Sequence, residues 1–122
     1  MARILIVEDE PAISENLAAL LRLRGHAVEV AGDGAAGIAA ARKKVPELVL
    51  LDVMLPGMSG FDACRMLRSD PKCAGAKIIM VTGLGRMGDV EDAFKAGADD
   101  YLIKPFDSER LFKKIDKVLA RP

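Results

Sequence analysis

The fold is decided by the stretch Leu48-Val49-Leu50-Leu51-Asp52, the most apolar run in the chain, which ends in a carboxylate. Three other short apolar runs also end in polar groups: Ile4 to Val7 precedes Glu8-Asp9-Glu10, Ile78 to Val81 precedes Thr82, and Tyr101 to Ile103 precedes Lys104-Pro105. Short apolar runs with helical patterns between them are typical of buried strands in a parallel sheet. Because the carboxyl ends of parallel strands lie at one edge, we expect these acids, the hydroxyl and the ammonium to meet in one ligand-binding crevice.

The segments between these runs carry the signals of helices and of one further strand. Helices are expected from Pro11 to just before Gly25, from Ala35 to Lys44, from the capping sequence Ser59-Gly60-Phe61-Asp62 onward, around Val90, Ala93 and Phe94 up to Gly97, and from Asp107-Ser108 onward. A short second strand is expected from Ala27 to Val30. This β–α alternation, repeated five times with right-handed crossovers, predicts an α/β fold: a three-layer doubly wound sandwich with a five-stranded parallel sheet and five helices.

Length and composition predict one soluble domain that covers residues 1–122. Lys plus Arg and Asp plus Glu number 18 each, so no net charge attracts nucleic acid or anionic lipid. No apolar stretch approaches the roughly 20 residues that span a bilayer. Because a strand is expected directly after Met1-Ala2-Arg3, we expect no signal peptide. Cys64 and Cys73 match no metal-site spacing and are expected to be free thiols. These features predict a cytoplasmic protein that binds neither nucleic acid nor membrane.

Each polar group at a strand end has an ordinary structural role when it is taken singly. Asp52 could cap a helix or lie in a turn, and the acids after the first strand could be a solvated helix start. Thr82 could be only the last residue of its strand, and Lys104 only a surface charge. Their joint placement at one edge is not expected from such roles, and it favours a functional site.

The types of side chain at this edge indicate phosphoryl chemistry. Clustered carboxylates raise one another's pKa unless a cation joins them, and Mg²⁺ prefers one or two carboxylates together with a phosphate oxygen. The Thr82 hydroxyl and the Lys104 ammonium would complement the charge on a transferring phosphoryl group. Asp52 is the carboxylate that ends the central strand and is therefore the candidate nucleophile.

The sequence resembles the receiver domains of two-component response regulators over essentially its whole length. The matching residues are Glu8-Asp9 after the first strand, Asp52 after the third, Pro56 and Gly60 in the following loop, Thr82 after the fourth strand, Tyr101 in the fifth, and Lys104-Pro105. The resemblance implies a flavodoxin-like fold, similar to chemotaxis regulators, with strand order 2-1-3-4-5. It also implies that the chain is not an enzyme on external substrates and catalyses only its own phosphorylation and dephosphorylation.

By this resemblance, Asp52 accepts a phosphoryl group from a phosphohistidine on a sensor histidine kinase or a histidine phosphotransfer protein. The implied cofactor is Mg²⁺, with Mn²⁺ as a possible substitute. Asp9 and Asp52 would bind the metal directly, Met54 through its backbone carbonyl, and Glu8 through a water. Glu8 stands where the family commonly has Asp, and Glu is a frequent variant there.

The resemblance further implies a switch that passes the signal to a partner. Lys104 and Thr82 would hold the phosphoryl oxygens. Movement of Thr82 toward the phosphoryl group would let Tyr101 turn inward. This would reshape the face formed by the fourth helix, the fifth strand and the fifth helix, to which a downstream target protein would bind. Receiver domains attached to winged-helix DNA-binding domains often pair a basic residue in the fourth helix with a Glu in the fifth helix of a dimer partner. Val90 and Arg110 occupy these two positions here, which argues against a dimer of that kind.

Two other functions are weighed against this one. A phosphatase with an Asp nucleophile would place an acid two residues after Asp52, where Met54 cannot donate a proton. A degenerate receiver would bind partners without phosphorylation, which the intact set of acids, Thr82 and Lys104 disfavours. Residues 83–88 spell GxGxxG, but they follow the fourth strand and are interpreted as a glycine-rich loop instead of a dinucleotide site.

Two further interpretations concern the phosphodonor and the lifetime of the phosphorylated state. His26, the sole histidine, precedes the second strand and is interpreted as a surface residue, so the phosphodonor histidine is expected on another protein. The resemblance to receiver domains implies that Met54 and Leu84 flank the Asp52–phosphorus bond. Because both side chains are bulky and apolar, we expect them to shield the bond from water and slow its hydrolysis.

Overall fold

The structure is a computed structural model that describes residues 2–83 and 87–121, and residues 87–89 are described by their backbone only. Five strands alternate with five helices: β1 (Arg3–Val7), α1 (Pro11–Leu23), β2 (Ala27–Ala31), α2 (Gly34–Lys43), β3 (Leu48–Asp52), α3 (Gly60–Ser69), β4 (Lys77–Thr82), α4 (Met87–Lys95), β5 (Asp100–Ile103) and α5 (Ser108–Leu119). Each predicted element is present, and several strands and helices begin or end one or two residues from the expected bounds.

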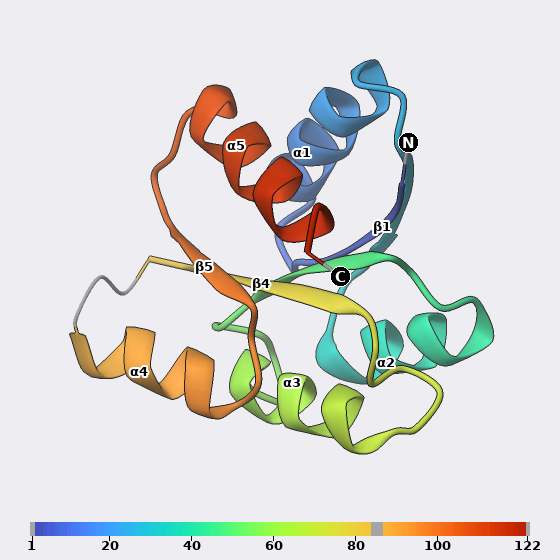
Figure 1. Cartoon of the computed structure of the whole chain (residues 1–122), viewed down its shortest axis with the longest axis vertical. Coiled ribbons are helices and arrows are strands. Elements are labelled where there is room, and N and C mark those ends of the chain that lie inside the picture. The colour runs from blue at the N-terminus through green and yellow to red at the C-terminus, as the bar shows by residue number, and fades with distance from the viewer. Residues whose placement is uncertain (1, 84–86, 122) are drawn as a thin grey trace.

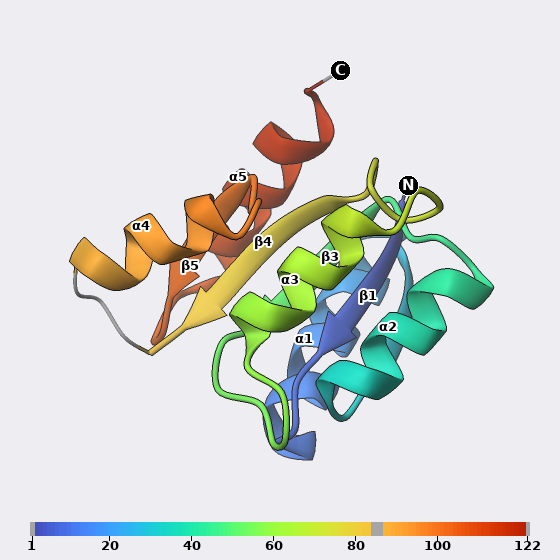
Figure 2. The same cartoon turned by 90° about the horizontal axis from the view of Figure 1, so that it is seen from below.

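The five strands form one parallel sheet in the order β2-β1-β3-β4-β5. Helices α1 and α5 cover one face and α2, α3 and α4 cover the other, which gives the three layers that the sequence predicts (Figures 1 and 2). β3 lies at the centre and all five of its residues are buried, so its continuous apolar run packs against helices on both faces. Among the described residues, no helix is both long and apolar enough to span a bilayer.

Local signals in the sequence set the ends of the helices. The side chain of Asp33 caps α2 by accepting a hydrogen bond from the Ala36 amide at 2.7 Å, and Asp107 caps α5 by accepting one from the Arg110 amide at 2.8 Å. Gly25, which follows α1, has φ +89°, in the left-handed region that glycine adopts without strain.

The cysteines and the histidine have structural surroundings. Cys64 and Cys73 are free and buried, as expected, and burial raises the pKa of the Cys64 thiol to about 11. His26 has intermediate exposure, so the prediction of a surface residue is confirmed in part. Its Nδ1 accepts a hydrogen bond from the backbone N–H of Ala2 at 3.0 Å. This contact ties the start of β2 to the start of β1, at the sheet edge opposite to the acids.

Candidate phosphoryl-transfer site

The strand registers bring the predicted polar groups to one level at the carboxyl edge of the sheet. Val7 of β1 pairs with Leu51 of β3, so the residues that follow them, Glu8 and Asp52, are neighbours across the two strands. β3 pairs in turn with β4, Asp52 lying opposite Val81. The register therefore produces the convergence that the apolar runs of the sequence predict.

The next two strands place Thr82 and Lys104 in the same way. Thr82 pairs with Ile103 of β5, and the backbone N–H of Lys104 donates a hydrogen bond to the Thr82 carbonyl at 2.7 Å. This bond holds the backbone of Lys104 directly beside the end of β4. The peptide bond between Lys104 and Pro105 is cis.

The Lys104 ammonium bridges two buried carboxylates. Its Nζ lies 3.3 Å from Glu8 Oε2 and 3.4 Å from Asp52 Oδ2. Glu8 and Asp52 are 4% and 5% exposed, whereas the Lys104 side chain is about a quarter exposed. A buried carboxylate is costly unless a cation or hydrogen bonds compensate it, so this ammonium stabilises the pair.

The surroundings of Glu8 raise the proton affinity of its carboxyl group. Burial, a hydrogen bond with Asp52 and the negative charge of Asp52 together raise the pKa of Glu8 to about 7, while Lys104 opposes the rise. In the absence of a metal ion, Glu8 therefore holds a proton over part of the neutral range. A further cation at this position would favour the ionised form of Glu8.

The donor atoms at the edge fit a hard divalent cation. Among the described residues, Glu8, Asp9 and Glu10 bring carboxylate oxygens within 4.8 Å of one another. Such oxygen ligands suit Mg²⁺, which keeps several waters and takes few protein ligands. Asp9 and Glu10 are exposed and can bind an ion from solvent, whereas Glu8 is buried behind them. Glu10 is the member of this group to which the sequence assigned no metal role.

The loop after β3 is held against the site by a glycine. A Cβ atom on Gly60, the first residue of α3, would lie 2.1 Å from the carbonyl oxygen of Asp52. Its backbone N–H also donates to the Val53 carbonyl at 2.8 Å. Only glycine permits this approach of two backbone segments, which is a physical reason for glycine at position 60.

Met54 follows the site with its side chain two-thirds exposed, and its backbone N–H lies 3.3 Å from Asp52 Oδ1. Leu84, the other residue expected to flank the phosphoryl group, lies outside the described residues, as do residues 85 and 86 of the GxGxxG loop. Two hollows flank the acids and the ammonium. One, of about 420 Å³, is lined by Glu8 and Asp9, and the other, of about 410 Å³, by Lys104 and Pro105.

Comparison with known proteins agrees with this geometry. The family model of the response regulator receiver domain matches residues 4–116. This chain belongs to the response regulator receiver domain family. The receiver domain is 43% identical over 121 residues to the DNA-binding dual master transcriptional regulator RpaA of Synechocystis. This alignment covers 99% of the present chain and 50% of RpaA. The receiver domain thus spans about half the length of that curated relative. It is also 43% identical over 120 residues to protein PilH of Pseudomonas aeruginosa, with 98% of this chain and 99% of PilH covered.

Solved receiver structures share the fold. A putative response regulator from Chloroflexus aurantiacus superposes with a TM-score of 0.94 at 34% identity, covering 98% of both chains. The receiver domain of a sensor histidine kinase from Pseudomonas aeruginosa, solved with magnesium coordinated in its active-site cleft, superposes with a TM-score of 0.91 at 31% identity and covers 98% of both chains. The flavodoxin-like arrangement and strand order expected for this receiver domain are confirmed.

Proposed function

We propose that this receiver domain takes a phosphoryl group onto Asp52 from a phosphohistidine of a sensor histidine kinase or a histidine phosphotransfer protein. The observation that carries the proposal is the Lys104 ammonium, 3.4 Å from Asp52 Oδ2 at the carboxyl edge of the sheet. A buried nucleophile paired with a cation is protected from solvent, and its cation can turn to the oxygens of an incoming phosphoryl group.

The proposed phosphoryl transfer is a displacement at phosphorus. An oxygen of the Asp52 carboxylate forms a bond to phosphorus while the bond from phosphorus to the imidazole nitrogen breaks, and that nitrogen keeps the electron pair. Lys104 and the hydroxyl of Thr82 would hold the phosphoryl oxygens. Beyond this step and the hydrolysis of its own acyl phosphate, the domain catalyses no reaction.

We propose Mg²⁺ as the cofactor, held by Asp9 and Asp52, by the carbonyl of Met54, and by Glu8 through a water. When bound, the ion neutralises the acids so that an anionic donor can approach. The exposed carboxylate of Asp9 supports a direct ligand role, and the burial of Glu8 supports an indirect one. Calorimetric titration with magnesium chloride tests these roles. Asp9→Ala removes most binding and Glu8→Gln weakens it less, whereas equal losses would contradict the assignment.

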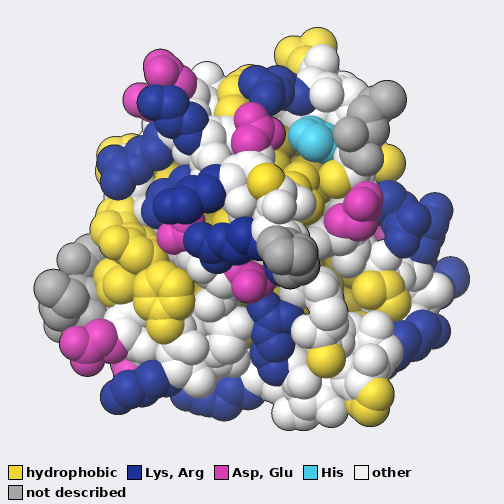
Figure 3. Space-filling model, viewed as in Figure 1, with side chains coloured by type: hydrophobic (Ala, Val, Ile, Leu, Met, Phe, Trp, Pro, Cys, Tyr) yellow, Lys and Arg dark blue, Asp and Glu magenta, His cyan; other side chains and the backbone are white. Residues whose placement is uncertain are grey.

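We propose that the phosphorylated state is passed to a downstream protein by the α4–β5–α5 face. Hydrophobic side chains gather over α4 and β5 beside Lys and Arg side chains over α5 (Figure 3). Phe94 of α4 is about half exposed, and its ring packs edge to face with that of Tyr101, with centroids 5.8 Å apart. The Lys114 ammonium lies 4.6 Å from the Tyr101 ring centroid and 3.0 Å from Asp100 Oδ1.

Incubation with Mg²⁺ and acetyl phosphate, followed by mass spectrometry, tests the proposed chemistry. A receiver domain accumulates one phosphate per chain that persists after the donor is removed. Rapid turnover of acetyl phosphate without an adduct would indicate a phosphatase, and no reaction would indicate a degenerate receiver. Either of these outcomes would contradict the proposal.

A further inference from the structure

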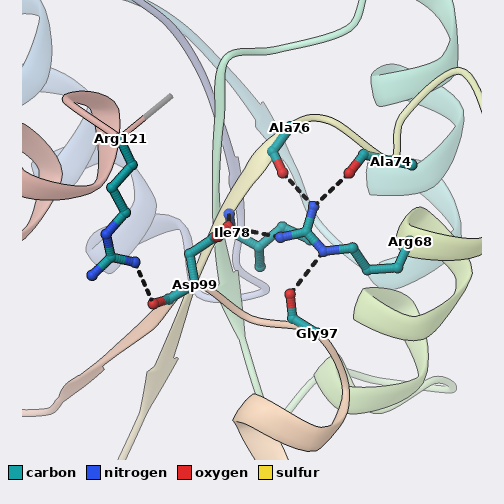
Figure 4. Close-up of polar contacts among 7 residues, drawn as sticks. All are labelled: Arg68, Ala74, Ala76, Ile78, Gly97, Asp99 and Arg121. Carbon is teal, nitrogen blue, oxygen red and sulfur yellow. Dashed lines mark hydrogen bonds and ion pairs between the residues drawn. The ribbon is translucent and has the colours of Figure 1, made fainter.

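One arginine joins three segments at the edge of the sheet opposite to the acids. Arg68 of α3 donates from Nε to the Gly97 carbonyl at 2.7 Å, and from Nη1 to the carbonyls of Ala74, at 2.9 Å, and Ala76 (Figure 4). Its Nη2 lies 2.7 Å from Asp99 Oδ2. We call Arg68, its three carbonyl partners and Asp99 the Arg68 cluster.

The ion pair between Arg68 and Asp99 lies where β5 begins. Asp99 Oδ2 also accepts the backbone N–H of Ile78 at 2.8 Å, and the backbone N–H of Asp99 donates to the Ile78 carbonyl at 2.8 Å. The side chains of Arg68 and Asp99 are each less than a quarter exposed, a setting in which a charged hydrogen bond is stronger than on the surface. The pair therefore holds the start of β5 against the start of β4.

Gly97 connects the cluster to the end of α4. It has φ +106°, and a Cβ atom there would lie 2.7 Å from Arg68 Cγ, so glycine both ends the helix and leaves room for the arginine. Its backbone N–H donates to the Phe94 carbonyl at 3.0 Å. The Arg68 cluster is thus one helical turn from the ring that contacts Tyr101.

We propose that Arg68 is a positioning residue for the contact between Phe94 and Tyr101. By holding Gly97 and Asp99, it fixes the carboxyl end of α4 and the start of β5 relative to each other. We call this fixed junction, residues 97–99, the pivot. The segments carrying Phe94 and Tyr101 emerge from this pivot, so their rings meet in one arrangement. The regulatory meaning of this pivot rests on the proposed function, because a rigid pivot lets a change at Asp52 reach the α4–β5–α5 face as a defined movement.

The chain offers a direct probe of this contact because Tyr101 is its only tyrosine and it has no tryptophan. Labelling with ¹³C-tyrosine gives one set of ring resonances in the NMR spectrum, and Phe94→Ala calibrates their position when the contact is lost. In the unphosphorylated protein, Arg68→Gln is expected to move the Tyr101 resonances most of the way to the Phe94→Ala position. The amides of Ala98 and Asp99 should also exchange about tenfold faster or more.

Arg65→Gln is the matched control. Arg65 lies on the same helix but pairs with Asp62 on an exposed surface, so its loss should leave Tyr101 unmoved. Circular dichroism shows whether each variant folds. If Arg68→Gln does not fold, Asp99→Asn removes the ion pair while keeping the side-chain shape, and it should move Tyr101 in the same direction by less. The proposal is overturned if the Tyr101 resonances stay at the parent position in a folded Arg68→Gln protein. If Arg68→Gln does not fold, the same result in Asp99→Asn overturns it.

A second arm separates this inference from the proposed function. With Mg²⁺ and acetyl phosphate, the parent should gain one phosphate and shift its Tyr101 resonances, and Arg68→Gln should gain the phosphate with a smaller shift. Equal shifts in the two phosphorylated proteins would refute the pivot. A parent that gains no phosphate refutes the proposed function, and the pivot is then decided by the unphosphorylated proteins alone.

Discussion

Replacing Lys104 with methionine tests whether its ammonium stabilises the buried carboxylates. The substitution keeps an unbranched side chain that is one atom shorter and removes a charge that lies 3.3 Å from Glu8 and 3.4 Å from Asp52. At an effective dielectric constant of about 20, each such pair corresponds to about 5 kcal/mol of Coulomb energy. Desolvation offsets much of this, and breaking a buried pair typically costs about 3–5 kcal/mol.

The loss depends on pH because Glu8 can take up a proton. Its pKa is raised from 4.5 to about 7 in the folded protein, so its contribution to the free energy of unfolding is greatest below pH 4.5 and falls as the pH rises to about 7. Without Lys104, which lowers this pKa, Glu8 holds its proton to higher pH. We therefore expect Lys104→Met to lower the free energy of unfolding by about 3 kcal/mol at pH 8, and by less at pH 6, where Glu8 is protonated.

Urea unfolding in EDTA, followed by circular dichroism at both pH values, measures the effect. Lys113→Met is the control, because Lys113 pairs with Glu109 at 3.8 Å with both side chains about four-fifths exposed, and such pairs contribute less than about 1 kcal/mol. Mg²⁺ should restore part of the stability at pH 8, since it replaces the missing positive charge. A loss that is equal at the two pH values, or larger at pH 6, would refute the reasoning.

Further predictions concern the loop, the metal, the switch and the lifetime of the phosphoryl group. Gly60→Ala forces backbone segments apart at Asp52 and should lower the free energy of unfolding by more than about 2 kcal/mol, and unchanged urea unfolding would contradict the close approach. The affinity for Mg²⁺ should rise with pH through about 7 as Glu8 ionises, and a flat calorimetric profile would argue against this linkage. Thr82→Ala should accept phosphate but leave the Tyr101 resonances nearly unshifted, and a full shift would break the proposed coupling. Met54→Asn should shorten the lifetime of the adduct in Mg²⁺, whereas an unchanged decay would mean that the exposed Met54 side chain does not shield the bond.

The sheet and the ends of its strands could be predicted from the sequence because their signals are local. Continuous apolar runs such as Leu48–Leu51 mark strands buried on both faces, and parallel strands bring their carboxyl ends together whatever the details of register. The same logic placed Asp52, Thr82 and Lys104 at one edge. Their individual roles came from the family resemblance, which the match over residues 4–116 supports at the level of the family.

Contacts between distant segments could not be predicted in this way. Lys104 and Glu8 are 96 positions apart, and the raised pKa of Glu8 follows from a burial that only the packed structure shows. Arg68 reads in the sequence as an ordinary charge in a helix, yet it joins carbonyls from two loops up to 29 positions away. Neither contact has a periodic signal, because each depends on how the loops close at opposite edges of the sheet.

The central claim is that Asp52 is the phosphorylated residue. Intact-mass spectrometry and peptide mapping after incubation with Mg²⁺ and acetyl phosphate test it, with Asp52→Asn compared with the parent and with Asp33→Asn, which replaces the carboxylate that caps α2. We predict one phosphate on the parent and on Asp33→Asn, mapped to the peptide that contains Asp52, and none on Asp52→Asn. Stoichiometric phosphate on folded Asp52→Asn, or a phosphate mapped to another residue of the parent, would contradict the account.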